Sequence, residues 1–274
     1  MQVESMQAEE LLAVASGAER WIDAYADDTG AGRRWGLAAE KPDRYLYTLY
    51  AGSAGITLFY LELFRATQAS GYLDIAIAAG DELLAQIPSL HPTCAPMGGW
   101  VGYMFVFNEL ARYSQQQRFR DAARTCAQKQ RDLAQPIGAG IGWIQQMPYA
   151  KLTGHDGVRE IHDMAEGAAG AGTYWLYAHD EGIHDQALVW ARLAADRLLE
   201  VAEVAQGGLR WQLMPDIPWP FDAPNFAHGT AGVAYFLTRV FEITGEQKYL
   251  DAAVAGAGPA LSRACRPGPF RYGP

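Results

Sequence analysis

The sequence of 274 residues contains few cysteines, and none of them forms a recognisable pattern. Cys94, Cys126 and Cys265 are widely separated, and no Cys-x-x-Cys spacing occurs. An odd number of scattered cysteines indicates reduced thiols rather than a disulfide framework.

Long apolar runs and basic clusters are also missing. No stretch of 18 consecutive apolar residues occurs, and residues 1–10 are acidic and lack the apolar core of a signal peptide. We therefore expect neither export nor membrane spanning, and a cytoplasmic protein. A net charge of -9 without any basic run argues against nucleic acid and against an anionic membrane surface as partners.

Glycine, by contrast, recurs in a pattern. The spacing Gly-x-x-Gly opens four amphipathic segments, and in three of them an aspartate follows 22 residues after the first glycine, at Asp74, Asp121 and Asp251. The four openings are Gly52–Gly55, Gly99–Gly102, Gly167–Gly170 and Gly229–Gly232.

The apolar periodicity predicts helices of two alternating kinds. Inner helices open with the glycines and are expected at 52–68, 96–114, 166–180 and 228–244. Outer helices are expected at 7–25, 72–87, 118–134, 184–202 and 247–264, with Gly245 as a C-cap. This alternation is typical of an all-α (α/α) toroid. We expect one domain over 1–274, with repeats near 7–68, 72–114, 118–180 and 184–244, an unpaired helix 247–264 and an irregular tail 265–274. We expect such a ring to be incomplete.

Crowding gives a physical reason for the glycines. Where the inner helices converge by their N-terminal ends, only glycine lets the backbones approach closely. The first-turn amides would then surround a central mouth and bind an anion or a polarised substrate. The alternative is that the glycines serve packing alone.

A second repeated pattern ends in tryptophan. Gly140-Ile-Gly-Trp143 matches Gly208-Leu-Arg-Trp211, and Gly32-Arg-Arg-Trp35 is a shorter version. Each segment could form a short strand or hairpin. Trp143 and Trp211 are candidate substrate-binding residues, although loop anchoring is the favoured role for such side chains.

Two of the glycine openings carry additional residues that resemble the lanthionine synthetase C-like family. Asp163-Met-Ala-Glu-Gly167-Ala-Ala-Gly170 looks like the family's Asp-x-x-x-Gly-x-x-Gly, and Ala227-His228-Gly229-Thr-Ala-Gly232 looks like its Ala-His-Gly-x-x-Gly. The resemblance covers roughly residues 45–264. It implies a seven-membered α/α toroid, of which about four repeats are present here, and a zinc-dependent cyclase that adds cysteine thiols to dehydroalanine or dehydrobutyrine in peptides.

The resemblance implies that Asp163 and His228 are the catalytic residues. Addition of a thiolate to a dehydroamino acid leaves an enolate that must be protonated, which suits a group that titrates near neutral pH. A helix N-terminus disfavours a positive charge, so we expect His228 to be neutral and able to accept a thiol proton.

The family's zinc ligands are absent from the sequence. The family places them in a Trp-Cys-x-Gly opening and in a Cys-His pair, both downstream of the His-Gly repeat, and this chain ends before either. None of the three cysteines stands just ahead of a glycine-opened helix, and four histidines, His155, His162, His179 and His184, make no convincing ligand set. We expect no metal site in this chain and no cyclisation by the chain alone, although zinc is expected for the complete family fold.

Two other classes of function stay open. Carbohydrate-active toroids use paired carboxylates, for which Asp163, Glu166, Asp216 and Asp222 are the candidates. A peptide-binding scaffold without catalysis is the other. The expected partners are a dehydrated peptide or a small thiol, with self-association through the open ends of the toroid.

Overall fold

A computed structural model describes six stretches of the chain: residues 8–38, 41–90, 93–146, 158–205, 207–213 and 225–264. The chain divides into two compact units, which are described separately. Unit 1 comprises residues 1–91 and 102–123, and unit 2 comprises residues 92–101 and 124–274.

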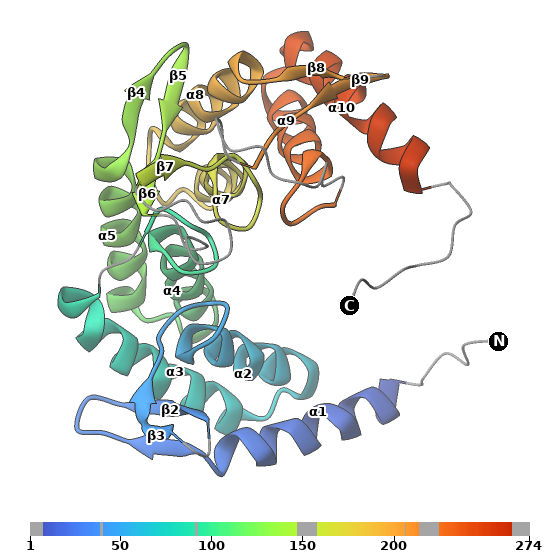
Figure 1. Cartoon of the computed structure of the whole chain (residues 1–274). Helices are drawn as coiled ribbons and strands as arrows, with labels where there is room; N and C mark the ends of the chain where they lie inside the picture. Colours follow the sequence, from blue (N-terminus) through green and yellow to red (C-terminus); the bar gives the residue numbers. More distant parts are fainter. Residues whose placement is uncertain are drawn as a thin grey trace. The chain divides into compact units, whose positions relative to one another are not determined.

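Unit 1 combines a small sheet with helices. An antiparallel sheet of β1, β2 and β3 follows α1, and helices α2 and α3 pack along each other (Figure 1). Tyr60, Leu83, Phe107 and Phe119 are fully buried in its core. The elements are α1 (Ala8–Asp23), β1 (Ala26–Asp28), β2 (Arg33–Ala38), β3 (Lys41–Tyr45), α2 (Ser53–Thr67), α3 (Ser70–Gln86), the 3-10 turn η1 (Ile87–Ser89), most of α4 (Trp100–Ser114) and the start of α5 (Gln117–Leu133).

Unit 2 contains the later helical pairs. Helix α7 packs against α8, α9 packs against α10, and the two inner helices α7 and α9 also pack against each other (Figure 1). The elements that follow α5 are β4 (Gln135–Ile137), β5 (Gly140–Gly142), β6 (Ile144–Gln146), β7 (Val158–Glu160), α7 (Ala168–Asp180), α8 (Ala187–Glu200), β8 (Glu203–Ala205), β9 (Gly208–Arg210), α9 (Thr230–Thr244) and α10 (Gln247–Ala264).

The predicted helices are present, but the inner ones begin one to four residues later than expected. The residues just before each first glycine form a turn instead, and Gly52, Gly167 and Gly229 are the N-caps of α2, α7 and α9. The predicted C-cap is confirmed, because Gly245 adopts a left-handed conformation with φ 70° and donates its amide to Phe241 O. The tail at 265–274 lies outside the described residues.

The three tryptophan segments form hairpins with one common register. The equivalent cross-strand pairs are Asp27 with Arg34, Gln135 with Gly142, and Glu203 with Arg210. The hairpins β4–β5 and β8–β9 pack against the outer helices α8 and α10, and β2 packs against α3. The weak sequence similarity between these segments therefore reflects one repeated structure.

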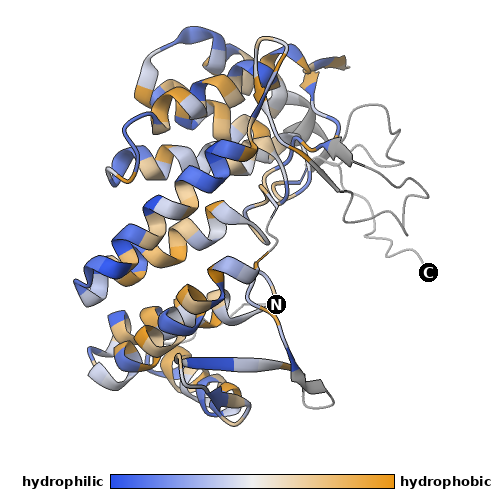
Figure 2. Cartoon of the chain, turned by 90° about the vertical axis from the view of Figure 1, so that its left-hand side faces the viewer, coloured by the Kyte–Doolittle hydropathy of each residue, from blue (hydrophilic) through white to orange (hydrophobic). Residues whose placement is uncertain are grey.

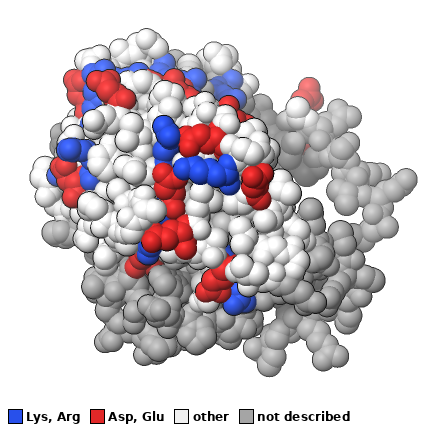
Figure 3. Space-filling model, turned by 90° about the horizontal axis from the view of Figure 1, so that it is seen from above, with Lys and Arg blue, Asp and Glu red and all other residues white. Residues whose placement is uncertain are grey.

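Surface patterns agree with a chain of amphipathic helices. Hydrophobic and hydrophilic residues alternate along the helices in Figure 2, and no described helix has the length and apolar character needed to cross a membrane. Acidic and basic side chains lie next to each other on the face shown in Figure 3. Among the ion pairs of unit 2, those of Arg192 with Glu246 and of Lys248 with Asp196 each have atoms 2.6 Å apart.

Candidate functional site

The loops before three inner helices share one hydrogen bond. In each, a polar side chain four residues before the first glycine accepts the backbone amide of the residue just before that glycine. Thr48 accepts from Ala51 at 3.1 Å. Asp163 accepts from Glu166 through Oδ1, and Asn225 accepts from His228, both at 2.7 Å. Oδ1 of Asp163 therefore stabilises the loop before α7, as Thr48 does before α2 and Asn225 does before α9.

The same loops explain the glycines. A Cβ added to either glycine of an opening would lie 2.0–2.4 Å from the carbonyl oxygen six residues earlier, at Gly52, Gly55, Gly99, Gly167, Gly170 and Gly232. The loop folds directly against the start of its own helix, and only glycine permits this approach. We predicted crowding between different helices, and that contribution is present at the second glycine of two openings: Gly170 faces Pro96, and Gly232 faces Met164, each from the loop of the preceding repeat.

The first-turn amides of α7 are not open to a ligand. Those of Ala168 and Ala169 donate to the carbonyls of Ile161 and His162 at 2.9 and 3.2 Å, and that of Gly170 donates to Asp163 O at 3.1 Å. The predicted ring of anion-binding amides is therefore wrong for this helix, because the preceding loop satisfies its donors.

Three inner-helix openings in unit 2 adjoin one another. The amide of Met97 donates to Ala165 O at 3.4 Å, and the amide of Ala165 donates to Ala227 O at 3.0 Å. Each of these residues stands two positions before the first glycine of its opening. These bonds support the predicted convergence for the loops that precede α4, α7 and α9, which all belong to unit 2, whereas Gly52 belongs to unit 1.

This arrangement brings Asp163 and His228 together. Oδ2 of Asp163 lies 2.7 Å from Nδ1 of His228; the Asp163 side chain is 1% exposed and that of His228 is 42% exposed. A carboxylate only accepts, so Nδ1 is the donor, and Nε2 is the ring nitrogen whose protonation changes.

The hydrogen bond that His228 donates to Asp163 raises the pKa of His228, and burial opposes this only in part. We predicted from the helix dipole that His228 would be neutral. The pKa of His228 is instead raised, because the charge-assisted hydrogen bond to Asp163, 2.7 Å long, outweighs the partial positive charge of the helix N-terminus.

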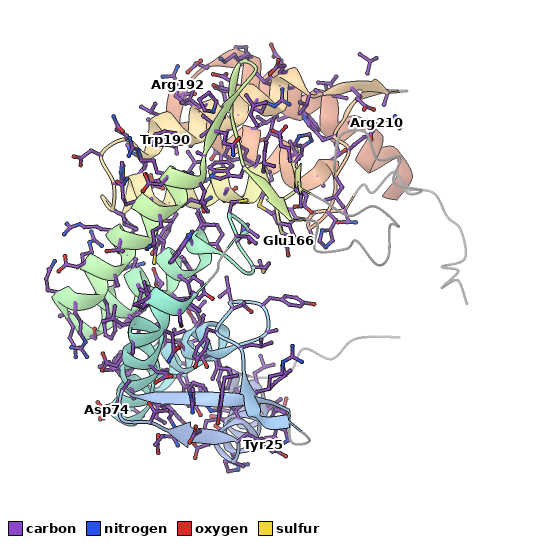
Figure 4. The ribbon with its side chains drawn as sticks, turned by 60° about the vertical axis from the view of Figure 1, so that its left-hand side comes forward. Tyr25, Asp74, Glu166, Trp190, Arg192 and Arg210 are labelled. Atoms are coloured by element: carbon purple, nitrogen blue, oxygen red, sulfur yellow. The ribbon has the colours of Figure 1, made fainter. Side chains whose placement is uncertain are left out.

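Glu166 and His228 occupy equivalent positions, each directly before the first glycine of its opening, Gly167 or Gly229. Glu166 interacts electrostatically with both Asp163 and His228. Burial and, to a smaller extent, the negative charge of Asp163 raise the pKa of Glu166, His228 offsets part of the effect, and the resulting pKa is about 7. Figure 4 places Glu166 in the loop leading into α7, while Trp190 and Arg192 lie on α8 away from it. We considered Glu166 only for carbohydrate chemistry, although its place just before Gly167 was a readable signal.

The two candidate substrate-binding tryptophans are buried. Trp143 and Trp211 are 2% and 5% exposed. Their indole Nε1 atoms donate to Gln130 O at 3.1 Å and to Leu198 O at 2.7 Å. This geometry favours loop anchoring over ligand stacking for both.

The described residues do not fit a zinc site. The thiols of Cys94 and Cys126 are buried and burial raises the pKa of both, which disfavours the thiolate that zinc binds. Nδ1 of His162 contacts Gln212 O at 3.2 Å, and its Nε2 lies 3.6 Å from Glu160. Across the part of the chain that the structure describes, no three His, Cys, Asp or Glu side chains gather as a metal-binding group. His155, Asp216, Asp222 and Cys265 lie outside that part.

Comparison with models of protein families shows to which family the chain belongs. The model of the lanthionine synthetase C-like proteins matches residues 44–257. The chain belongs to the lanthionine synthetase C-like family. The comparison with curated proteins gave no match.

Solved structures identify the fold of this family member. The Lin0763 protein of Listeria innocua is 16% identical with a TM-score of 0.63, and the match covers 95% of this chain and 73% of that one. Nisin cyclase is 16% identical with a TM-score of 0.62 over 79% of this chain, which spans 58% of the length of the cyclase. The GH76A alpha-1,6-mannanase from Salegentibacter sp. HEL1_6 is 14% identical with a TM-score of 0.56, covering 96% and 72%. The expected all-α toroid fold class is confirmed.

Proposed function

We propose that Asp163, Glu166 and His228 transfer the protons when a thiol adds to a dehydroalanine or dehydrobutyrine residue of a peptide. The observation that carries the proposal is the 2.7 Å contact between Asp163 and His228. The two residues come from the two motifs by which the sequence resembles the family, and the family model covers both.

The reaction forms a carbon–sulfur bond at the β-carbon, and the electrons of the double bond move into an enolate. Glu166, with a pKa of about 7, accepts the proton of the thiol as a carboxylate. His228, whose protonated form Asp163 stabilises, donates a proton from Nε2 to the α-carbon of the enolate. Transfer of the thiol proton from Glu166 to His228 restores the starting state, so the sum is addition of one thiol across one double bond.

Asp163 has two positioning functions in this scheme. Its Oδ1 fixes the loop by accepting the Glu166 amide, and its Oδ2 fixes the His228 ring and stabilises the positive charge on it. A glycosidase would need a second carboxyl group available to its sugar. Since Asp163 is buried and bound to His228, the geometry favours the thiol reaction.

The zinc of the family has no ligand set among the described residues and takes no part in this proposal. The expectation that the chain alone does not cyclise peptides stays a prediction. The test therefore uses an acidic aryl thiol, which is ionised at neutral pH without a metal, and N-acetyl-dehydroalanine amide as the acceptor.

The experiment follows the loss of dehydroalanine absorbance with and without the protein. The wild-type chain should accelerate the addition above the buffer rate. The His228→Asn variant should lower the rate of the protein-catalysed addition by about 100-fold, because it lacks the general acid. His179→Asn is the control, because His179 is an exposed residue in the last turn of α7. Equal rates for wild type and His228→Asn, with both proteins folded, would refute the proposal.

A further inference from the structure

One side-chain contact recurs between consecutive inner-helix openings of unit 2. The residue three positions before the first glycine of an opening lies over the second glycine of the next opening: Pro96 over Gly170, and Met164 over Gly232. A Cβ added to these glycines would lie 2.5 Å from Cγ of Pro96 and 2.9 Å from Cβ of Met164. Both glycines are buried. The glycine without a side chain therefore makes room for a side chain of the preceding opening.

One backbone hydrogen bond accompanies this contact. The amide two positions before the first glycine donates to the equivalent carbonyl of the next opening, from Met97 to Ala165 at 3.4 Å and from Ala165 to Ala227 at 3.0 Å. Each opening thus has two sides. The projecting side consists of the side chain and the amide, and the receiving side consists of the second glycine and the carbonyl.

The projecting side of the opening before α9 makes neither contact with a described residue. Phe226 stands where Pro96 and Met164 stand in the preceding openings, and it is 51% exposed. Its ring lies 5.4 Å from the ring of Tyr235 on α9, which is 44% exposed. The exposed Ala227 donates no hydrogen bond from its amide to any described residue. An aromatic pair and a backbone donor therefore lie together at the surface of unit 2.

The receiving side of the first opening, in unit 1, is likewise available. Beyond α2 itself, only Leu49 of the same loop lies within 4 Å of a Cβ added to Gly55, among the residues that the structure describes. Gly55 is half-buried, unlike its equivalents in unit 2. Tyr50 is 82% exposed, and its carbonyl accepts no hydrogen bond from the described part of the chain. A cavity of about 450 Å³ lies here, lined by Gly52, Gly55 and Ile56 among other residues.

The two available sides are the two halves of one repeated contact. We propose that the first opening of a second copy of this chain packs on the opening before α9. Phe226 of one copy then lies over Gly55 in the cavity of the second copy, and the Ala227 amide donates to the Tyr50 carbonyl of the second copy. The expected self-association thereby has a specific contact.

The sequence around the two sides is compatible with burial. Residues 46–57 contain no charged side chain, so the contact buries no unpaired ionic group from the receiving side. An aromatic side chain that enters a cavity is typical of the residues that contribute most to protein association. Because the contact joins two different surfaces, each copy in a pair keeps one side available, and further copies add until a ring closes or a filament grows.

The inference does not depend on the proposed proton transfer, since none of its contacts involves Asp163, Glu166 or the His228 side chain. It does place a second copy beside the catalytic loop, because Phe226 and Ala227 directly precede His228.

Two charged variants test the contact from its two sides by analytical ultracentrifugation. Phe226→Asp disrupts the projecting side, and Ala51→Asp puts a charge on the receiving side, where the exposed Ala51 lines the cavity. Each substitution should weaken the self-association of the wild-type chain by at least about tenfold. An equimolar mixture of the two variants should form a 1:1 dimer, because each variant retains the side that the other lacks.

A matched control separates this contact from a general effect of charge. Val189 on α8 is also 51% exposed and lies outside the openings, so Val189→Asp should leave the association unchanged. Thermal melts check that all three variants are folded. The proposal is overturned if the wild type is monomeric at the highest concentration reached, if Ala51→Asp associates as well as the wild type, or if the mixture of folded variants forms no dimer.

Discussion

The carboxylate of Asp163 binds the imidazole of His228 across 65 residues of sequence, with Oδ2 and Nδ1 2.7 Å apart. Each residue stands in the loop before an inner helix, and the backbone bond from Ala165 to Ala227 brings the two loops together. The proposed proton-transfer site thus depends on the packing of one repeat against the next.

Loss of the carboxylate should change the titration of His228. Because Asp163 raises the pKa of His228, we expect Asp163→Asn to lower that pKa, as measured by NMR of the imidazole. The wild-type pair contributes stability below the unfolded pKa of about 6.5, and this contribution is lost as the pH rises through the folded value. Asp180→Asn, at the exposed end of α7, should leave the His228 titration unchanged, and an equal shift in both variants would contradict the assignment.

Glu166 should make the stability of the chain depend on pH. Its pKa rises from 4.5 to about 7 on folding, so the contribution of Glu166 to stability is greatest below pH 4.5 and is lost as the pH rises through 7. Glu166→Gln cannot ionise, and we expect its unfolding free energy to vary less over this interval. Urea titrations at several pH values provide the measurement; parallel profiles for wild type and variant would exclude a raised pKa.

The ion pair of Arg197 and Glu160 tests the buried electrostatics of unit 2. Nη2 of Arg197 lies 2.8 Å from Glu160, and the side chains are 14% and 7% exposed. Arg197→Met leaves the carboxylate buried without its main partner and should cost about 3–5 kcal/mol. Arg239→Met breaks an exposed pair with Glu242 and should cost less than about 1 kcal/mol.

The same pair has a defined pH dependence. Burial alone would raise the pKa of Glu160, but the His162 ring, 3.6 Å away, and the hydrogen bonds from Arg197 lower it from 4.5 to about 2. The stabilisation is present above pH 4.5 and is lost as the pH falls to 2. The difference between wild type and Arg197→Met should therefore shrink in acid, and a difference that grows in acid would contradict this account.

Glycine at the second position of an opening should be essential for stability. A Cβ at Gly170 would lie 2.0 Å from Met164 O and 2.5 Å from Pro96. We expect Gly170→Ala to destabilise the chain by about 3 kcal/mol in thermal or urea unfolding. Gly71→Ala in α3 meets nothing within 4 Å and should raise stability by up to about 1 kcal/mol. Comparable stability of the two variants would show that the loop before α7 yields easily.

The repeat pattern predicted the helices well because each depends on local sequence. The four glycine openings and Gly245 have short-range causes, namely close approach of the preceding loop and a left-handed C-cap. The repeated Gly-x-x-Trp segments likewise indicated short strands or hairpins, and the structure adds that these hairpins share one register. These features need only neighbouring residues, which a sequence displays directly.

The electrostatics of the site could not be predicted in the same way. The protonation of His228 depends on an atom of Asp163, and the pKa of Glu166 depends on burial by elements distant in sequence. Among the described residues Nε1 of Trp35 has no hydrogen-bond partner, whereas Nε1 of Trp143 and of Trp211 each have one. The sequence could not show this difference, since the pattern around Trp35 matches those around Trp143 and Trp211. Only the packed chain shows which donor has an acceptor.

The configuration of the addition product tests the central claim most directly. A proton delivered by His228 reaches one face of the enolate, whereas a proton from water reaches both. The measurement is chiral chromatography of the adduct formed from N-acetyl-dehydroalanine amide and an aryl thiol. We predict an excess of one configuration at the α-carbon with the wild-type chain and a racemic product with His228→Asn. A racemic product from the wild type, or an equal excess from His228→Asn, would contradict the assignment of His228 as the proton donor.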